Sequence, residues 1–324
     1  MLACTYVSNN KNRIATIAET GNFTRGFKTT VTGAATYGFD LNGNMARDPH
    51  KKMTVSYFYH NLPKKVTFDN GNIIEWVYDA TGNKLTKKTN AATNNVTHYI
   101  NGIEYVGTVA GYNIEAIYHA EGRCTPQSST WRYEYSLRDH LGNTRITFTD
   151  LNSDGTITAS EILQQNHYYP FGGNIEGLTS AGTPNKYQYN GKEWNADFGL
   201  EWNDYGARAY DPWVGRWWSV DPMAEKYCRW SSYNYGVDNP VRFIDPDGKS
   251  ATDYVYLNMQ GKEIGRLKSN KVQRVTIIKD ENVGAFQALP RSYSSVSKYQ
   301  SLGISYDTKS QWFVKESAFG GLVI

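Results

Sequence analysis

Residues 150–161, DLNSDGTITASE, have the side-chain types and the spacing to bind a metal ion. They fit the pattern D-x-[DN]-x-[DN]-G-x5-E, which is the calcium loop of an EF-hand. Oxygen-only ligands suit Ca2+ over zinc or copper. The sequence therefore predicts a calcium site, with a Gly/Asp-rich hairpin turn as the alternative because RITFTD before the loop is typical of a strand. The expected ligands are Asp150, Asn152, Asp154, the carbonyl of Thr156, Thr158 directly or through water, and both carboxylate oxygens of Glu161.

Other reactive patterns are missing from the sequence. The six histidines are scattered without an HExxH motif, and there is no GxSxG elbow. Three cysteines, more than a hundred residues apart, exclude a disulfide scaffold. The net charge of +3 is spread thinly, so nucleic-acid binding is not indicated. No apolar run reaches the roughly 18 residues that span a bilayer, and the first residues do not form a signal peptide.

The elements that must hold such a loop are strands, because 29 Gly and 25 Tyr favour tight turns and pleated surfaces. An aromatic–polar pair followed by a Gly or Pro turn also recurs every 19 to 21 residues. Each unit reads strand, polar turn, strand, and a single hairpin cannot bury a face alone. The sequence predicts an all-β chain of stacked hairpins in which Tyr78, Tyr99 and Tyr118 are buried in equivalent orientations. The pairs are Phe39-Asp40, Tyr59-His60, Tyr78-Asp79, Tyr99-Ile100, Tyr118-His119 and the looser Leu137-Arg138-Asp139.

These residues carry a family resemblance. VYDATGNKLTKKT resembles a tyrosine–aspartate (YD) repeat of the Rhs family. DHLGNTR, YYPFGG, YNGKEW, GLEWNDYGARAYDPWVGRWWSVDP and NPVRFIDPDGK resemble the Rhs repeat-associated core domain, so the match runs from about Tyr37 to Lys249. The resemblance implies that the repeats wind as a spiral β-shell around a C-terminal toxin domain, and that the core domain plugs one end.

The resemblance also divides the chain. Residues 1–36 are a partial N-terminal segment, 37–149 are the YD-repeat hairpins, and 150–161 are the inserted loop. Residues 162–249 are the core domain, and 250–324 are a variable tip with fresh strand patterns (DYVYLNM, GKEIGRLKS, QRVTIIK). Whole shells need more repeats, so we expect the C-terminal end of a larger protein, or a truncated or orphan copy, that is secreted or displayed by a bacterium. Its expected partners are its own C-terminal effector segment, an immunity protein and secretion machinery.

The resemblance further implies self-cleavage just past a DPxG motif by two aspartates, here Asp221 and Asp245. Two close carboxylates cannot both ionise, so one holds a proton and polarises the scissile carbonyl while the other activates water. The cleavage region would be Gly248, Lys249 and Ser250. Lys249 departs from the leucine common at its position in relatives, and a charged residue fits an apolar pocket poorly. The alternative is that both Asp-Pro steps are Asx turns.

Arg216 is a further candidate for this site, because it is close to Asp221 in sequence and could orient or ion-pair with a carboxylate. Stacking of Arg216 on Trp217 or Trp218 is the alternative.

Two classes of function follow. The first is a structural shell and plug of an Rhs-type polymorphic toxin used in interbacterial competition, which encapsulates or presents a C-terminal effector. The second is an aspartic autoprotease that releases residues 250–324. A carbohydrate-binding surface module is a third possibility, based on the Trp/Tyr cluster at 194–235, although such a cluster is more often a packed core.

Overall fold

The computed structural model describes residues 2–19, 26–27, 35–90, 96–108, 111–181, 185–227, 229–241, 243–249, 253–258, 263–268, 275–278, 304–306 and 312–314. Within these ranges the regular structure consists of β-strands and short 3-10 helices, which confirms the all-β prediction. None of the described helices is long and apolar enough to cross a membrane. The 3-10 helices are at Ala159–Glu161, Tyr189–Gly191, Asp197–Gly199, Ala224–Tyr227 and Gly236–Asp238.

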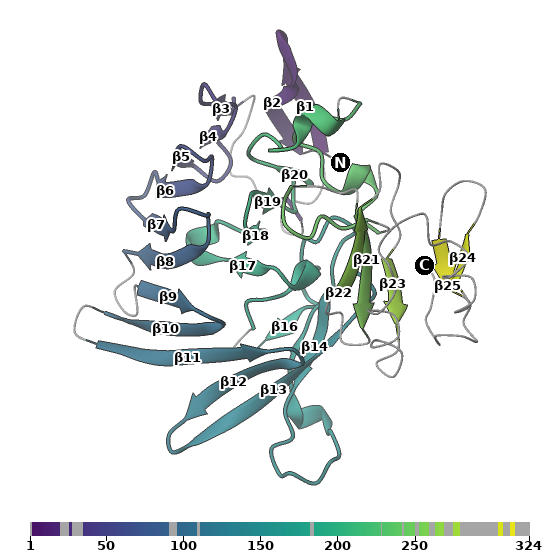
Figure 1. The fold of residues 1–324 in the computed structure, drawn as a ribbon. Coiled ribbons are helices and arrows are strands. Elements are labelled where there is room, and N and C mark those ends of the chain that lie inside the picture. The colour runs from purple at the N-terminus through teal and green to yellow at the C-terminus, as the bar shows by residue number, and fades with distance from the viewer. Residues whose placement is uncertain are drawn as a thin grey trace.

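One antiparallel sheet of 14 strands forms the wall of the molecule (Figure 1). Its strands follow one another in chain order from β3 to β16, so each strand pairs with its neighbours in sequence. This order confirms the predicted stack of hairpins. The strands are β3 (Gly38–Phe39), β4 (Met45–Asp48), β5 (Met53–Tyr57), β6 (Pro63–Phe68), β7 (Ile73–Tyr78), β8 (Lys84–Thr89), β9 (Val96–Ile100), β10 (Ile103–Thr108), β11 (Gly111–His119), β12 (Gly122–Gln127), β13 (Thr130–Arg138), β14 (Thr144–Phe148), β15 (Ile162–Gln165) and β16 (Ser180–Ala181).

The hairpin turns explain why the repeat is visible in the sequence. In the β7–β8 turn, Asp79 accepts the backbone amide of Asn83 at 2.9 Å through Oδ1 and its side-chain amide at 2.8 Å through Oδ2. Gly82 has a φ of 90°, a conformation that favours glycine. The same bonds join Asp40 to Asn44 and Asp139 to Asn143. The Asp-x-x-Gly-Asn motif is therefore one turn used three times.

The predicted tyrosines lie at matching places in the wall. Tyr78, Tyr99 and Tyr118 are at or next to the last residue of β7, β9 and β11, each the first strand of a hairpin. Burial raises the pKa of all three hydroxyls. The pair at Tyr59-His60 was misplaced, because Tyr59 is 84% exposed in the turn while Tyr57 ends β5 and donates to the Met45 carbonyl at 2.7 Å.

A second, four-stranded sheet of residues 193–217 lies beside strands of the wall (Figure 1). It has the order β17 (Glu193–Asn195), β18 (Trp202–Asp204), β19 (Ala209–Asp211) and β20 (Arg216–Trp217). Within the predicted core domain of residues 162–249, β15 and β16 belong to the wall, so we call residues 185–249, which contain this second sheet, the plug. Leu200, Trp202 and Trp218 of the plug join one hydrophobic core with side chains of β4 to β7. The plug therefore packs against the wall by burying large aromatic side chains.

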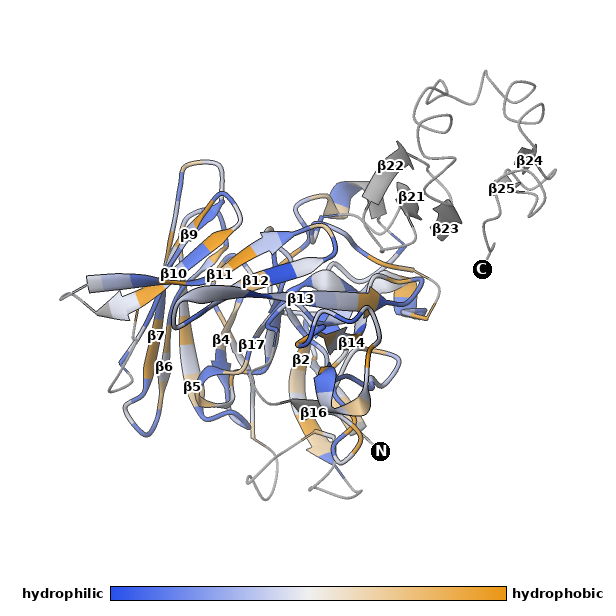
Figure 2. Ribbon diagram, turned by 90° about the horizontal axis from the view of Figure 1, so that it is seen from below, coloured by the Kyte–Doolittle hydropathy of each residue, from blue (hydrophilic) through white to orange (hydrophobic). Residues whose placement is uncertain are grey.

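The two ends of the chain form smaller sheets. β1 (Leu2–Val7) and β2 (Asn10–Glu19) make a hairpin. Beyond the plug, β21 (Asp253–Asn258), β22 (Glu263–Lys268) and β23 (Val275–Ile278) form a three-stranded sheet, which confirms the predicted strand patterns. β24 (Ile304–Tyr306) and β25 (Trp312–Val314) form another pair. In Figure 2 the residues with uncertain placement are grey, and the wall strands mix hydrophilic and hydrophobic positions along their length.

Candidate functional site

Asp221 and Asp245, 24 residues apart in sequence, meet on one arginine in the plug. Nη2 of Arg208 donates to Oδ2 of Asp221 and to Oδ2 of Asp245, in both cases at 3.1 Å. Arg208 directly precedes β19, Asp221 follows β20, and Asp245 follows the 3-10 helix at Gly236–Asp238. The fold therefore brings together the two carboxylates that the sequence predicted as a pair.

Arg208 is buried, and its guanidinium contacts one aromatic ring, two backbone carbonyls and the two carboxylates. Its guanidinium carbon lies 4.2 Å from the ring centroid of Trp217, and Nη1 donates to the Ser232 carbonyl at 3.3 Å. Its Nε donates to the carbonyl of Gly248, inside the predicted cleavage region. Only 2% of the arginine is exposed, and a buried cation of this kind needs such partners. Arg208 thus links the aspartate pair to the backbone next to the DPDG motif.

The DPDG segment adopts a backbone that only glycine fits at its end. Gly248 has a φ of 72°, and a Cβ there would lie 3.1 Å from the backbone nitrogen of Arg208 and 3.2 Å from Cβ of Tyr205. The next amide, that of Lys249, donates to Oδ1 of Asp245 at 3.1 Å. Arg208 and Asp245 therefore hold the two sides of the Gly248–Lys249 peptide bond, its carbonyl and its amide.

The surroundings of the two aspartates differ. Burial raises the pKa of this carboxyl above its usual range, and the charge of Arg208 only partly offsets the effect. Asp245 is 1% exposed and accepts hydrogen bonds from both Arg208 and the Lys249 amide. Burial thus shifts the pKa of one carboxyl, while the other is held by two hydrogen bonds.

Lys249 does not meet the apolar pocket that the sequence led us to expect. Its side chain is exposed, so a charge at this position carries no desolvation cost. Ser250, the last residue of the predicted cleavage region, lies outside the described residues.

The structure places Arg216 away from the aspartates. Its Nη2 donates to the Asn12 carbonyl at 2.6 Å, and its guanidinium lies 5.2 Å from the ring centroid of Tyr233. Arg208 makes both contacts considered for Arg216, the carboxylate pairing and the stacking on Trp217. The available signal was its setting in YGARAYDP, an apolar and aromatic segment in which a buried arginine needs acidic partners.

The predicted calcium loop lies between β14 and β15 and is closed by its own amides. Asp150 accepts the Gly155 amide at 2.9 Å, and Asp154 accepts the Thr156 amide at 2.7 Å. Glu161 accepts the amides of Leu151 and Thr158, each at 2.8 Å. Among the described residues, no three His, Cys, Asp or Glu side chains are grouped closely enough to hold a metal ion. The donor atoms suit calcium, but Glu161 would have to exchange its amide bonds for the ion.

A charged seam joins the plug to the wall, and its centre is Glu193. The Glu193 carboxylate pairs with Lys84 of β8 and accepts the hydroxyl of Tyr99 of β9 at 2.8 Å. Lys84 also donates to Asp204 at 2.6 Å, and Lys87 of β8 lies 3.7 Å from Glu193. Because the seam is buried on both sides, salt screens it much less than surface pairs.

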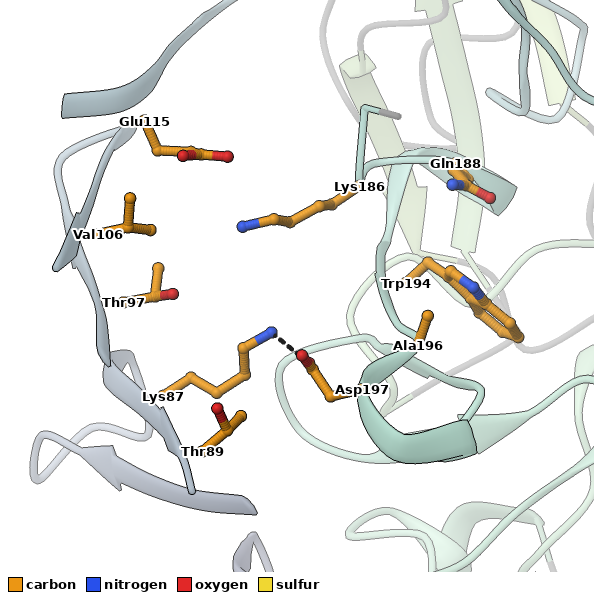
Figure 3. A pocket seen from close by; sticks show the side chains of 10 residues that line it. All are labelled: Lys87, Thr89, Thr97, Val106, Glu115, Lys186, Gln188, Trp194, Ala196 and Asp197. Carbon is orange, nitrogen blue, oxygen red and sulfur yellow. Dashed lines mark hydrogen bonds and ion pairs between the residues drawn. The ribbon is translucent and has the colours of Figure 1, made fainter. Parts of the chain in front are cut away.

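A cavity of about 290 Å3 opens beside this seam (Figure 3). Strands β8 to β11 line one side with Lys87, Thr97 and Glu115, while Lys186 and Asp197 of the plug line the other. The Lys87 ammonium is held by Asp197 at 2.9 Å, and Lys186 by Glu104 at 3.0 Å. The lining thus combines paired charges with apolar groups such as Val106 and Trp194.

The Trp/Tyr cluster at 194–235 is largely a core. Trp202, Trp217, Trp218, Tyr210 and Tyr235 are all at most 2% exposed. Their rings pack on one another, as in the 4.0 Å stack of Tyr210 and Tyr235. These rings are not accessible for stacking on a sugar.

The chain is similar in sequence to parts of much longer proteins. No family model matches the chain. Salivary gland surface protein 1 of Aedes aegypti is 27% identical over 245 residues, which cover 67% of this chain and 7% of that protein. Toxin subunit YenC2 of Yersinia entomophaga is 28% identical over 204 residues, 56% of this chain and 20% of the subunit. The chain therefore spans a fifth or less of these relatives.

A solved structure has the same fold. The crystal structure described as TcdB2-TccC3-Cdc42 superposes with a TM-score of 0.55 and 22% identity, covering 76% of this chain and 13% of that one. A wall of repeat hairpins is thus shared with a toxin complex, and the chain has a toxin subunit among its homologues.

Proposed function

We propose that this chain is the shell and plug region of an Rhs-type polymorphic toxin that encapsulates or presents a C-terminal effector. The observation that carries the proposal is the 14-stranded wall in chain order, packed against a plug from which residues 250–324 continue. The toxin subunit among its homologues supports the same assignment. In such an assembly the protein would be secreted or displayed on a bacterial cell, and an immunity protein and secretion machinery would be its further partners.

Encapsulation predicts that the tip is protected from proteases in the complete protein. A recognition site for a specific protease inserted within residues 279–303 should be cut far more slowly than the same site in the exposed turn at 128–129 between β12 and β13. Gel analysis of a time course measures both rates, and unfolding in urea should make them equal. Equal rates in the folded protein would contradict encapsulation.

We also propose that the plug cleaves the chain between Gly248 and Ser250. Arg208 carries this proposal, because one buried guanidinium binds both aspartates and the Gly248 carbonyl. The ionised carboxylate would take a proton from water, whose oxygen attacks the scissile carbonyl, while the protonated carboxyl polarises that carbonyl. The C–N bond then breaks, the leaving amine receives a proton, and residues after the cut are released.

Calcium binding at 150–161 is a further proposal for this chain. The loop has three carboxylates (Asp150, Asp154, Glu161) besides Asn152, one carbonyl and Thr158, within the six to eight oxygens that calcium takes. We expect weak affinity, on the order of 10⁻⁴–10⁻³ M as in extracellular modules.

Millimolar calcium should therefore raise the melting temperature of the chain by mass action, and Glu161→Gln should remove the effect. Thermal melts with and without calcium measure this, and magnesium at equal concentration controls for ionic strength because it demands a rigid octahedral site. No heat of binding in a calorimetric titration at millimolar calcium would remove the proposal.

A further inference from the structure

Three consecutive carbonyls of the DPDG segment are each held by a donor from the plug. The Pro246 carbonyl accepts from Nζ of Lys192 at 2.6 Å. The Asp247 carbonyl accepts from the backbone amide of Ala207 at 3.2 Å, and the Gly248 carbonyl from Nε of Arg208. The segment that leads into the proposed cleavage region is thus fixed along its backbone, independently of its side chains.

Lys192 is the one charged side chain in this row other than Arg208, and its own position is well defined. Its backbone amide donates to the Tyr189 carbonyl at 2.9 Å, and its carbonyl accepts from the Gln188 amide at 3.0 Å. Its ammonium lies 5.3 Å from the ring centroid of Tyr205, which favours a cation at that point. A lysine with a flexible stem is therefore held at the backbone, at the ring and at Pro246.

We propose that Lys192 is a positioning residue for self-cleavage, a role that rests on the proposed cleavage between Gly248 and Ser250. By binding the Pro246 carbonyl, its ammonium sets the direction in which the backbone enters the aspartate pair. Pro246 has a fixed φ, so anchoring its carbonyl limits the rotation that reaches Gly248. Misplacing a reacting bond by about 1 Å costs on the order of 100-fold in rate. A side chain that binds the backbone two residues before Gly248 can therefore control cleavage without acting as acid or base.

The first arm of the test measures the self-cleavage rate. Lys192→Met should slow cleavage by roughly 10- to 100-fold, and Lys192→Arg, which keeps a cationic donor, should restore most of it. The pH dependence of the remaining cleavage should be unchanged, because the aspartates still supply the acid and base. Lys88→Met, on the exposed face of β8, is the matched control and should cleave as the wild type.

The second arm does not need cleavage. In the uncut Asp221→Asn chain, hydrogen exchange of the backbone amides of Asp245 and of residues 247–249 should be at least about 10-fold faster with Lys192→Met than with Lys192, and Lys88→Met should not change it. Lys192→Gln, which keeps a donor on a shorter stem, replaces the Met variant if that variant does not fold. Unchanged exchange would overturn the role of Lys192. A wild type that stays intact would overturn the proposed cleavage and with it the role of Lys192 in cleavage, whereas accelerated exchange would still show that Lys192 fixes the segment.

Discussion

Replacing either Asp221 or Asp245 with Asn is expected to abolish self-cleavage and leave the fold intact. An amide has nearly the shape of a carboxylate and still accepts a hydrogen bond from Arg208, but it can neither supply the acid proton nor take a proton from water. Loss of general acid–base catalysis costs on the order of 10²–10⁴ in rate. Intact-mass measurements of the purified chain over time should show wild-type fragments that meet between Gly248 and Ser250, and a full-length variant.

A control variant and the pH dependence of the rate make this experiment specific. Asp69→Asn removes an aspartate that pairs with Arg47 on the exposed surface of the wall, and it should cleave as the wild type. The wild-type rate should fall as the pH rises, because the raised pKa of Asp221 keeps its proton at low pH and loses it as the pH passes that pKa. Unaltered cleavage in both Asn variants would reduce the two aspartates to turn residues.

Replacing Lys84 with Met should destabilise the chain by about 3–5 kcal/mol, the cost of breaking a buried ion pair and leaving its partner unpaired. Its ammonium holds both Glu193 and Asp204 and lies 4.5 Å from the ring centroid of Tyr99. Burial acts to lower the pKa of Lys84, yet the two carboxylates outweigh it and the pKa is raised. Urea denaturation measures the loss as a lower midpoint at constant slope.

The control is another wall lysine with an exposed partner. Lys65 of β6 pairs with Glu75 of β7 at 3.0 Å, and Lys65→Met should cost less than about 1 kcal/mol. A loss of that small size for Lys84→Met as well would mean that the seam does not hold the plug.

The seam also sets an acid limit on stability. Burial acts to raise the pKa of Glu193, but Lys84 and Lys87 lower it to about 2, below the roughly 4.3 of an unfolded glutamate. A depressed folded pKa gives stability that is present above about pH 4.3 and is lost as the pH falls through about 2. Denaturation midpoints of the wild type should drop across this window, and those of Lys84→Met should drop less.

The wall could be predicted from sequence because its information is local. Each turn is specified within five residues, as in Asp79 to Asn83, and neighbouring strands are neighbours in the chain. The one misplaced pair, at Tyr59, arose where Asn61 adopts the positive φ that glycine takes in the other turns, so the usual Gly marker was absent. No other residue pattern in the sequence marked the position of that turn.

The site was harder to predict because its decisive contacts are distant in sequence. The two aspartates were found through their Asp-Pro motifs, but their common partner was sought beside Asp221 in the chain and is instead Arg208, 13 residues earlier. Lys84 and Glu193 are 109 residues apart. No periodicity or spacing encodes which buried lysine will meet which glutamate, since that depends on how the plug is seated.

The chain-order wall makes the length of this architecture easy to vary in evolution. Duplication of one 19- to 21-residue unit adds a hairpin at a single junction and requires no strand to cross another. The plug limits where this is tolerated. Lys84 of β8 and Tyr99 of β9 both donate hydrogen bonds to the carboxylate of Glu193. A repeat unit inserted between these two strands would separate the two donors. The number of repeat units should therefore vary among relatives in the part of the wall that does not contact the plug. The number of strands around Glu193 should stay constant.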